Sequence, residues 1–175
     1  GTPASYAECF EWFVAPYPYL GDPMTDGDPT KSPHVIVNSW SCPESEGCTD
    51  PLILQAATEQ VRAAGIFPVV SAGNMGGTCG IINTPAAIYD ASFTVGSTRQ
   101  NGAISGFSSR GPVTSNRPKP DISAPGSDTY SAKLNNTWGN LSGTSMAAPH
   151  VAGLVALIIS ADPQLDGDVD LIEGA

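Results

Sequence analysis

The stretch HVIVNSWSCPESEGCTDPLILQAATEQVRAAGIFPVVSA, residues 34–72, decides the fold class. Residues 34–38 form a continuous apolar run, as expected of a strand that is buried on both faces. Residues 50–65 begin with Asp-Pro and end at a glycine, which predicts a helix with a capped start and a left-handed end. Residues 66–72 form a second apolar strand. This order of strand, helix and strand predicts a right-handed crossover. The expected class is therefore α/β, with a mainly parallel sheet flanked by helices.

Further segments along the chain extend this pattern. A helix is predicted over residues 2–14, because a threonine N-cap and a proline at the first helical position precede a periodic apolar stretch. Residues 93–96 predict a short strand. Residues 145–159 are apolar nearly all round, which is typical of a helix buried in a large core. Residues 16–33 and 110–126 are rich in proline and are expected to be loop and coil.

Composition narrows the classes of partner. The chain has 175 residues, a net charge of −10, 19 glycines and 16 prolines, which fits one loop-rich domain. An excess of acidic residues repels phosphate backbones and anionic lipids, so we expect neither a nucleic acid nor a membrane as partner. No apolar run reaches 18 residues and no basic-then-apolar leader opens the chain, so any export signal is expected to have been removed.

Four cysteines bear on the cellular compartment. Cys42 and Cys48 flank a short turn-like stretch, and this spacing predicts a small disulfide loop and an oxidising, extracellular location. The alternative is free thiols in a reduced protein. Cys9 and Cys79 are expected to pair with each other or with a cysteine outside the chain. No pair of cysteines has zinc-ligand spacing, so a structural zinc site is not expected.

The first candidate catalytic residue is Ser145, within Gly-Thr-Ser-Met-Ala-Ala-Pro-His at residues 143–150. Its hydroxyl is predicted to lie in the first turn of the apolar helix, where free backbone N–H groups and the helix dipole favour negative charge. That environment suits a serine nucleophile and the oxyanion that its attack would create. An ordinary helix cap is the alternative.

The second candidate is Asn74, which follows Ser71, Ala72 and Gly73 at the end of the second predicted strand. Side chains at the carboxyl ends of parallel strands face the crevice in which α/β proteins bind ligands. An amide there can donate a hydrogen bond to an oxyanion, and a preceding glycine permits an unusual backbone angle. The alternative is a turn residue that tolerates left-handed angles.

Four motifs together resemble those of one known family. Residues 143–153 resemble the active-serine signature of the subtilisin-like serine peptidases, the subtilases. Residues 71–74 are similar to that family's oxyanion-asparagine segment, residues 107–112 to its usual loop, and residues 119–126 to the stretch before the serine motif. The four motifs also occur in the same order along the chain as in that family. The resemblance implies a subtilisin-like fold and a secreted serine endopeptidase that acts on polypeptides, with Ser145 as nucleophile and Asn74 as oxyanion donor.

The resemblance also implies how a peptide would bind. Ser39, Trp40 and Ser41 would lie antiparallel to the substrate and bind its main chain through backbone hydrogen bonds. Ser71, Ala72 and Gly73 would form one wall of the primary specificity pocket. In the family the histidine at position 150 is a buried structural residue.

One departure from the family pattern concerns the general base. Subtilase catalysis needs an aspartate and a histidine from Asp-Ser/Thr-Gly and His-Gly-Thr motifs, and neither motif occurs in this sequence. His150 is rotated and displaced along the helix from Ser145, and His34 begins a strand at the end away from the crevice. Residues 1–175 are therefore expected to form a single partial catalytic domain, inactive alone, whose aspartate and histidine lie upstream.

The missing motifs leave two further expectations. A subtilase-like, non-catalytic peptide-binding module is the alternative function. A sheet without its first strands would have an unpaired edge, so we expect a homo-oligomer through that edge, docking of the N-terminal portion, or a rearranged fold.

Other side chains give weaker signals. The acidic segment of Asp22, Asp26, Gly27 and Asp28 matches no complete calcium loop, so a solvated loop is preferred. No metal or cofactor is expected, although calcium stays open. Trp40 and Tyr130 fit either a substrate cleft or core packing, and residues 166–173 predict a terminal helix with an aspartate cap.

Overall fold

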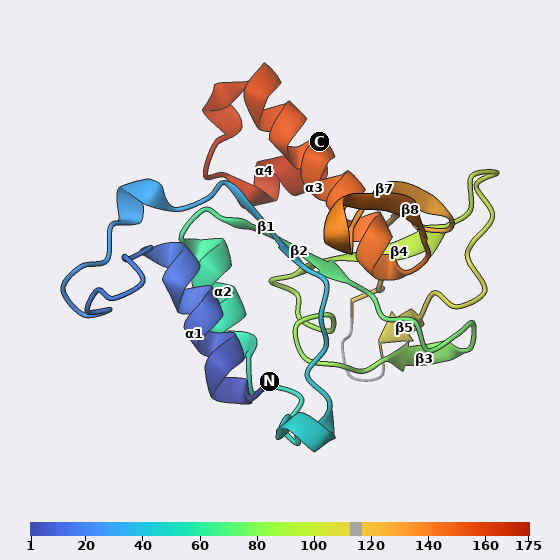
Figure 1. Ribbon diagram of the computed structural model, residues 1–175, viewed down its shortest axis with the longest axis horizontal. Helices are drawn as coiled ribbons and strands as arrows, with labels where there is room; N and C mark the ends of the chain where they lie inside the picture. The colour runs from blue at the N-terminus through green and yellow to red at the C-terminus, as the bar shows by residue number, and fades with distance from the viewer. Residues whose placement is uncertain (113–116) are drawn as a thin grey trace.

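A four-stranded parallel sheet forms the centre of the chain, in a computed structural model that describes residues 1–112 and 117–175 (Figure 1). Its strands are β1 (Val35–Asn38), β2 (Phe67–Ser71), β4 (Phe93–Thr98) and β6 (Ile122–Pro125), in the spatial order β1-β2-β4-β6. Within the described residues β1 pairs only with β2, so it lies at one edge. The predicted α/β class and the parallel crossover are confirmed.

Helices cover both faces of this sheet. On one face lie α1 (Pro3–Val14) and α2 (Gln55–Ala63), side by side (Figure 1), where Phe10 and Val61 pack against Ile36 of β1. On the other face lies α3 (Thr144–Ala161), which packs against Phe67 and Val69 of β2. The short helix α4 (Val169–Gly174) joins the same cluster. The predicted helix over residues 2–14 is confirmed.

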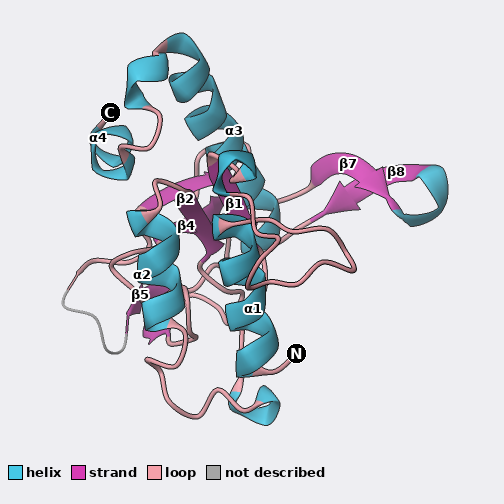
Figure 2. Cartoon of the chain, turned by 90° about the vertical axis from the view of Figure 1, so that its left-hand side faces the viewer, coloured by secondary structure: helices cyan, strands magenta, loops and turns pink. Residues whose placement is uncertain are grey.

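Two small ribbons and four short turns complete the described structure. Strands β3 (Cys79–Ile82) and β5 (Arg110–Pro112) pair in parallel, whereas β7 (Thr129–Lys133) and β8 (Thr137–Leu141) form an antiparallel hairpin. The hairpin projects from the body of the molecule (Figure 2). The 3-10 turns are Pro29–Lys31, Glu44–Glu46, Leu134–Asn136 and Pro163–Leu165.

Two sequence expectations about local structure are wrong. The helix expected from residue 50 begins at Gln55, because the Tyr89 hydroxyl accepts from the Leu54 N–H at 3.1 Å and donates to the Pro51 carbonyl at 2.8 Å. These bonds hold the preceding residues in a turn. The coil expected over residues 110–126 contains β5 and β6, and its residues 113–116 lie outside the described part.

The burial predicted for the serine helix is also wrong. One side of α3 is buried, but Leu154 is 50% exposed and Leu157 is 68% exposed. Its 18 residues have a mean hydropathy of 1.6, which is long and apolar enough to cross a membrane by length and composition, although only 39% of them are buried here. The all-round apolar character of α3 is therefore not explained by its packing within this chain.

The disulfide between Cys42 and Cys48 is confirmed, with its two Cα atoms 5.6 Å apart and both residues buried. Cys9 and Cys79 are exposed and free, so they do not pair with each other in this structure. The bridge closes the loop that follows directly on Ser41, and it packs in a cluster with Leu54 and Val70 of the sheet's α2 side.

Removing this bridge with a double Cys42→Ser, Cys48→Ser substitution is expected to lower the free energy of unfolding by roughly 2–3 kcal/mol, because the unfolded chain regains the entropy of an open loop. Urea denaturation followed by circular dichroism measures the loss. The matched control is Cys9→Ser, which removes a free, exposed thiol and should leave the midpoint unchanged. Equal midpoints for all three proteins would show that the bridge contributes nothing.

Candidate active site

The predicted site residues come together around one cavity of about 310 Å³. It lies where β1 and β2 end and α3 begins, which is the crevice position expected for a parallel sheet. All eight of the predicted residues line it: Ser39, Trp40, Ser41, Ser71, Ala72, Gly73, Asn74 and Ser145. Ser145, Asn74 and the segments 39–41 and 71–73 are thus adjacent in space.

Asn74 is held at the start of α3 by Thr144. Its Oδ1 accepts from the Thr144 backbone N–H at 2.8 Å and from the Thr144 hydroxyl at 3.0 Å. Because a backbone N–H can only donate, these bonds fix which end of the amide is oxygen. The Nδ2 end is then left to donate elsewhere, and a Cβ placed on Gly143 would lie 3.5 Å from it. The donor group therefore lies over the start of the serine helix.

Gly73 supplies the turn that brings Asn74 to this place. Its φ is +94°, in the left-handed region that side chains with a Cβ rarely adopt. Its N–H donates to Thr144 Oγ1 at 3.2 Å. Thr144 is fully buried, so one hydroxyl joins the end of β2 to the start of α3.

Replacing Thr144 by valine keeps the shape and removes that hydroxyl. We expect a loss of about 1–3 kcal/mol of unfolding free energy, because the Gly73 N–H loses its acceptor and Asn74 Oδ1 loses one of two donors. Chemical denaturation of residues 1–175 measures this. Thr144→Ser retains the hydroxyl and should recover most of the loss; equal destabilisation by serine would assign the effect to packing of the methyl group.

Trp40 both lines the cavity and packs in the core, the two alternatives that the sequence left open for it. It lines the cavity, and its ring also stacks on Tyr6 of α1 at 4.2 Å and contacts Phe10 at 5.7 Å. Next to it, the Ser39 hydroxyl donates to the Ser145 carbonyl at 3.2 Å, which ties the end of β1 to the serine helix. The wall formed by residues 39–41 is therefore fixed from both sides.

Tyr6 links this wall to the disulfide loop, since its hydroxyl donates to the Glu46 carboxylate at 2.6 Å. That hydrogen bond is the main reason that the pKa of Glu46 lies below its ordinary value. A carboxyl whose pKa is lowered by folding stabilises the protein above its unfolded-state pKa, and the contribution is lost as the pH falls through the folded-state pKa.

Tyr6→Phe keeps the stacking on Trp40 and removes the hydrogen bond. We expect this variant to lose less stability on acidification below the ordinary glutamate pKa than the unchanged chain does. Thermal melts at a series of pH values measure the difference. Parallel pH profiles for the two proteins would rule out this contact as a source of acid sensitivity.

Sequence reasoning missed five lining residues: Met75, Ile81, Asn83, Thr84 and Ser109. Ser109 lies close to the turn after β2, where its Oγ accepts from the Met75 N–H at 3.1 Å. Asn83 and Thr84 follow β3 directly. Asn83-Thr84-Pro85 carries a turn signal that could have pointed to this wall. None of the thirteen lining residues is charged.

Neither histidine of the chain reaches Ser145. His150 is exposed, so the implied buried structural role is wrong for this chain, and its Nδ1 lies 2.8 Å from the Met146 carbonyl. His34 is an exposed histidine whose Nε2 lies 3.3 Å from Asp166. The structure thus places neither His34 nor His150 at the Ser145 end of the cavity.

The acidic loop shows internal pairing. Asp26 Oδ2 accepts from the Asp22 N–H at 2.9 Å, and Asp28 caps the turn Pro29–Lys31. Among residues 1–112 and 117–175, no group of three or more His, Cys, Asp or Glu side chains could hold a metal ion.

Comparison with known proteins decides the family. A model described as "Subtilase family" matches residues 17–169, which is most of the chain. The chain belongs to the subtilase family. This subtilase chain is 37% identical over 173 residues to Bacillopeptidase F of Bacillus subtilis (strain 168), covering 96% of the chain and 11% of that protein.

Two further similarities agree. Subtilisin DY of Bacillus licheniformis is 41% identical over 114 residues, covering 64% of the chain and 39% of that protein. A crystal structure of a cold adapted subtilisin-like serine proteinase matches with a TM-score of 0.73 and 26% identity, covering 99% of the chain and 53% of the other. The subtilase chain thus spans about half, or less, of the length of these relatives.

Proposed function

We propose that this chain is the carboxyl-side part of the catalytic domain of a subtilisin-like serine endopeptidase. The observation that carries the proposal is the single cavity lined by Ser145, Asn74 and the segments 39–41 and 71–73. Ser145 Oγ would attack the carbonyl carbon of a peptide bond and form an acyl-enzyme that water then hydrolyses. The oxyanion of the tetrahedral intermediate would accept from Asn74 Nδ2 and from the Ser145 N–H.

The proton of Ser145 would pass to a histidine outside this sequence, oriented by an aspartate that is also outside it. This part of the proposal is supported by the positions of His34 and His150, which leave Ser145 without a base from within the chain. Residues 1–175 are then a single partial catalytic domain, and they are inactive alone.

The peptide substrate would lie antiparallel to Ser39, Trp40 and Ser41, with Ser71, Ala72 and Gly73 as one wall of the pocket for its side chain. The buried disulfide supports a secreted protein, since such bonds persist in oxidising compartments. A net charge of −10 supports neither a nucleic-acid nor a membrane partner.

A fluorophosphonate probe tests the proposal, because a serine that is activated by a base attacks its phosphorus, releases fluoride and becomes a stable phosphonate ester. Residues 1–175 alone should remain unlabelled. The same residues, expressed with the polypeptide that precedes Gly1, should gain one adduct at Ser145, located by peptide mass spectrometry.

Rapid labelling of residues 1–175 alone would overturn the argument from the missing base. Absence of labelling in the longer protein, combined with retained binding of peptides, would favour the second candidate, a non-catalytic peptide-binding module. The observation that favours this rival is the absence of a charged residue among those that line the cavity.

A further inference from the structure

Ser109 is a buried serine of the cavity wall that contacts the turn carrying Asn74. It is only 1% exposed, although it lines the same cavity as Ser145. Its backbone N–H donates to the Gly73 carbonyl at 3.0 Å, and its Oγ accepts from the Met75 N–H at 3.1 Å. Gly73 and Met75 are the two neighbours of Asn74 in the chain. One residue therefore holds the backbone on both sides of Asn74.

The close approach of Ser109 to this turn depends on the glycine at position 73. A Cβ placed on Gly73 would lie 3.2 Å from Ser109 Oγ, which is closer than a Cβ normally approaches another atom. Because Gly73 has no side chain, the backbone just before Asn74 can lie directly against the Ser109 hydroxyl. The contact is thus built from both sides, by the glycine of the turn and by the serine of the loop.

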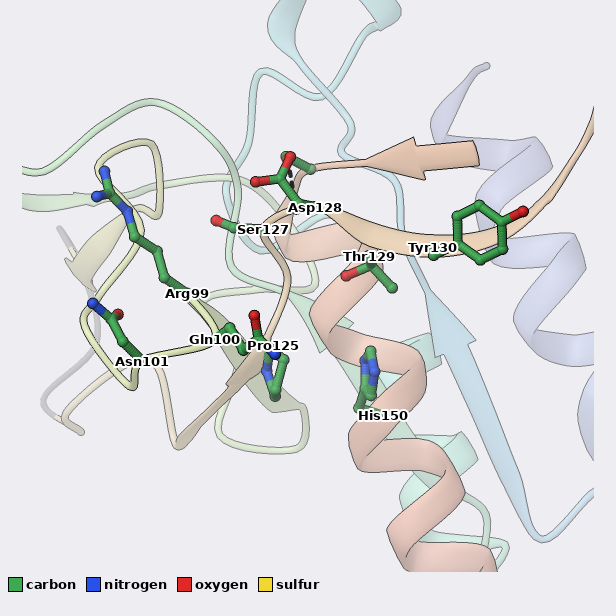
Figure 3. A pocket seen from close by; sticks show the side chains of 10 residues that line it. Arg99, Gln100, Asn101, Pro125, Ser127, Asp128, Thr129, Tyr130 and His150 are labelled. Atoms are coloured by element: carbon green, nitrogen blue, oxygen red, sulfur yellow. Dashed lines mark hydrogen bonds between the residues drawn. The ribbon is translucent and has the colours of Figure 1, made fainter. Parts of the chain in front are cut away.

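The loop that carries Ser109 is itself fixed to the central sheet. The Ser105 N–H donates to the Ser97 carbonyl of β4 at 2.8 Å, and the Ser97 N–H donates to Ser108 Oγ at 3.0 Å. The Ser105 hydroxyl lies 2.8 Å from the Ser97 hydroxyl and 2.8 Å from that of Ser127. Ser127 follows β6 and lines a cleft of about 980 Å³, which Figure 3 shows. Because several separate hydrogen bonds hold the loop, the loss of one should not displace it.

Thr144 and Ser109 hold different parts of Asn74. The Thr144 N–H and hydroxyl donate to Oδ1 and so fix the oxygen end of the amide. These bonds alone would leave the amide free to pivot about Oδ1 whenever the backbone of the turn moved. Ser109 opposes such movement because it binds the peptide groups before and after Asn74. The direction of Nδ2 therefore depends on both residues together.

We propose that Ser109 is a positioning residue for Asn74, which keeps the turn after β2 in the backbone conformation from which Nδ2 reaches the oxyanion. This proposal rests on the proposed function. A donor to an oxyanion is most effective when it is already in place as the charge develops. A displacement of about 1 Å can cost about 10²-fold in rate. A residue that holds the turn can therefore control kcat without touching the reacting atoms.

Two other roles for Ser109 make different predictions. As part of the pocket wall it would contact the substrate, and its removal would change KM with kcat unaffected. As a purely structural residue it would stabilise the fold, and its removal would lower the free energy of unfolding without affecting the chemical step. The positioning role instead predicts a lower kcat, a nearly constant KM, and an effect that requires the Asn74 amide.

Ser109→Ala, made in the protein that includes the polypeptide preceding Gly1, separates these roles. We expect kcat on a peptide substrate to fall about tenfold and KM to change by less than about twofold. The matched control is Ser108→Ala, which also removes a buried serine hydroxyl that accepts from a backbone N–H. The control should lose a similar amount of stability and keep kcat within about twofold.

The dependence on Asn74 is measured in an Asn74→Leu background. That variant has no amide to position, so the addition of Ser109→Ala should lower kcat by less than about twofold more. A further loss of about tenfold would overturn the proposal, because Ser109 would then act without Asn74. A change confined to KM would overturn it too, as would equal losses of kcat in Ser109→Ala and Ser108→Ala.

Exchange of the Met75 N–H with solvent tests the contact independently of activity. Labelling the methionines with nitrogen-15 makes this amide observable by NMR. Exchange should be at least about tenfold faster in Ser109→Ala and unchanged in Ser108→Ala. Equal rates in both variants and the unchanged protein would overturn the proposal. Faster exchange in Ser109→Ala, in a protein that hydrolyses no peptide, would overturn the proposed function and support the contact of Ser109 with the turn.

Discussion

Alanine in place of Ser145 is expected to lower peptide hydrolysis by the complete domain about 10⁶-fold and to abolish fluorophosphonate labelling. The reason is chemical: without Oγ no acyl-enzyme can form, and the oxyanion donors have no tetrahedral intermediate to stabilise. Stability should change little, because the Ser39 hydroxyl donates to the backbone carbonyl of Ser145 and that carbonyl remains. Initial rates on a peptide substrate and intact-protein mass after labelling measure the two effects.

Ser142→Ala is the matched control for this variant. Ser142 lies three residues before Ser145 and outside the cavity, and its hydroxyl accepts from the Asp128 N–H at 2.9 Å. The substitution removes this hydroxyl and leaves Ser145 unchanged. Labelling of this control should proceed at the unchanged rate. If the Ser145→Ala protein were labelled as fully as its control, the nucleophile would be another residue and the assignment of the cavity would fail.

The centre of the fold could be predicted because its signals are local. β1 and β2 are unbroken apolar runs, and the helix between them ends just before Gly65, as predicted. The crossover between them then predicts that these two strands are parallel, as they are. The serine helix was also found from its apolar run, and its length was right to within two residues at each end.

The start of α2 and the β3–β5 pair could not be predicted because contacts distant in the sequence decide them. Tyr89, 35 residues away, holds the Leu54 N–H and delays the helix that Asp50 and Pro51 would otherwise begin. β3 and β5 are short, lack alternation, and exist only as a pair. Tertiary context overrides local preference in both cases.

The residues of the site also divide into those that the sequence predicted and those that it did not. Ser145 and Asn74 stand at the ends of regular elements, so their positions followed from strand ends and the helix start. Met75, Asn83 and Ser109 lie in irregular segments, whose approach to the cavity depends on turns such as the one after Gly73. The exposure of His150 could not be foreseen, because apolar periodicity does not say which side of a helix the same chain covers.

Asn74→Asp is expected to lower kcat of the complete domain by about 10²–10³-fold while KM changes little. Aspartate keeps an oxygen for the two hydrogen bonds from Thr144, so the turn after β2 and the start of α3 should be retained. It replaces the Nδ2 donor by a second oxygen, which cannot donate to the oxyanion when ionised and repels it. The loss is therefore confined to the transition state.

Asn74→Leu provides the second measurement that separates positioning from donation. Leucine has a similar size but removes both the donor and the acceptor, so it should lose the same activity and, in addition, about 1–3 kcal/mol of stability, since the Thr144 N–H and hydroxyl lose their partner. Steady-state kinetics and urea denaturation of both variants give the comparison. If Asn74→Asp retained kcat within threefold, Asn74 would serve only to hold the helix start, and the oxyanion would have to be stabilised by backbone N–H groups alone.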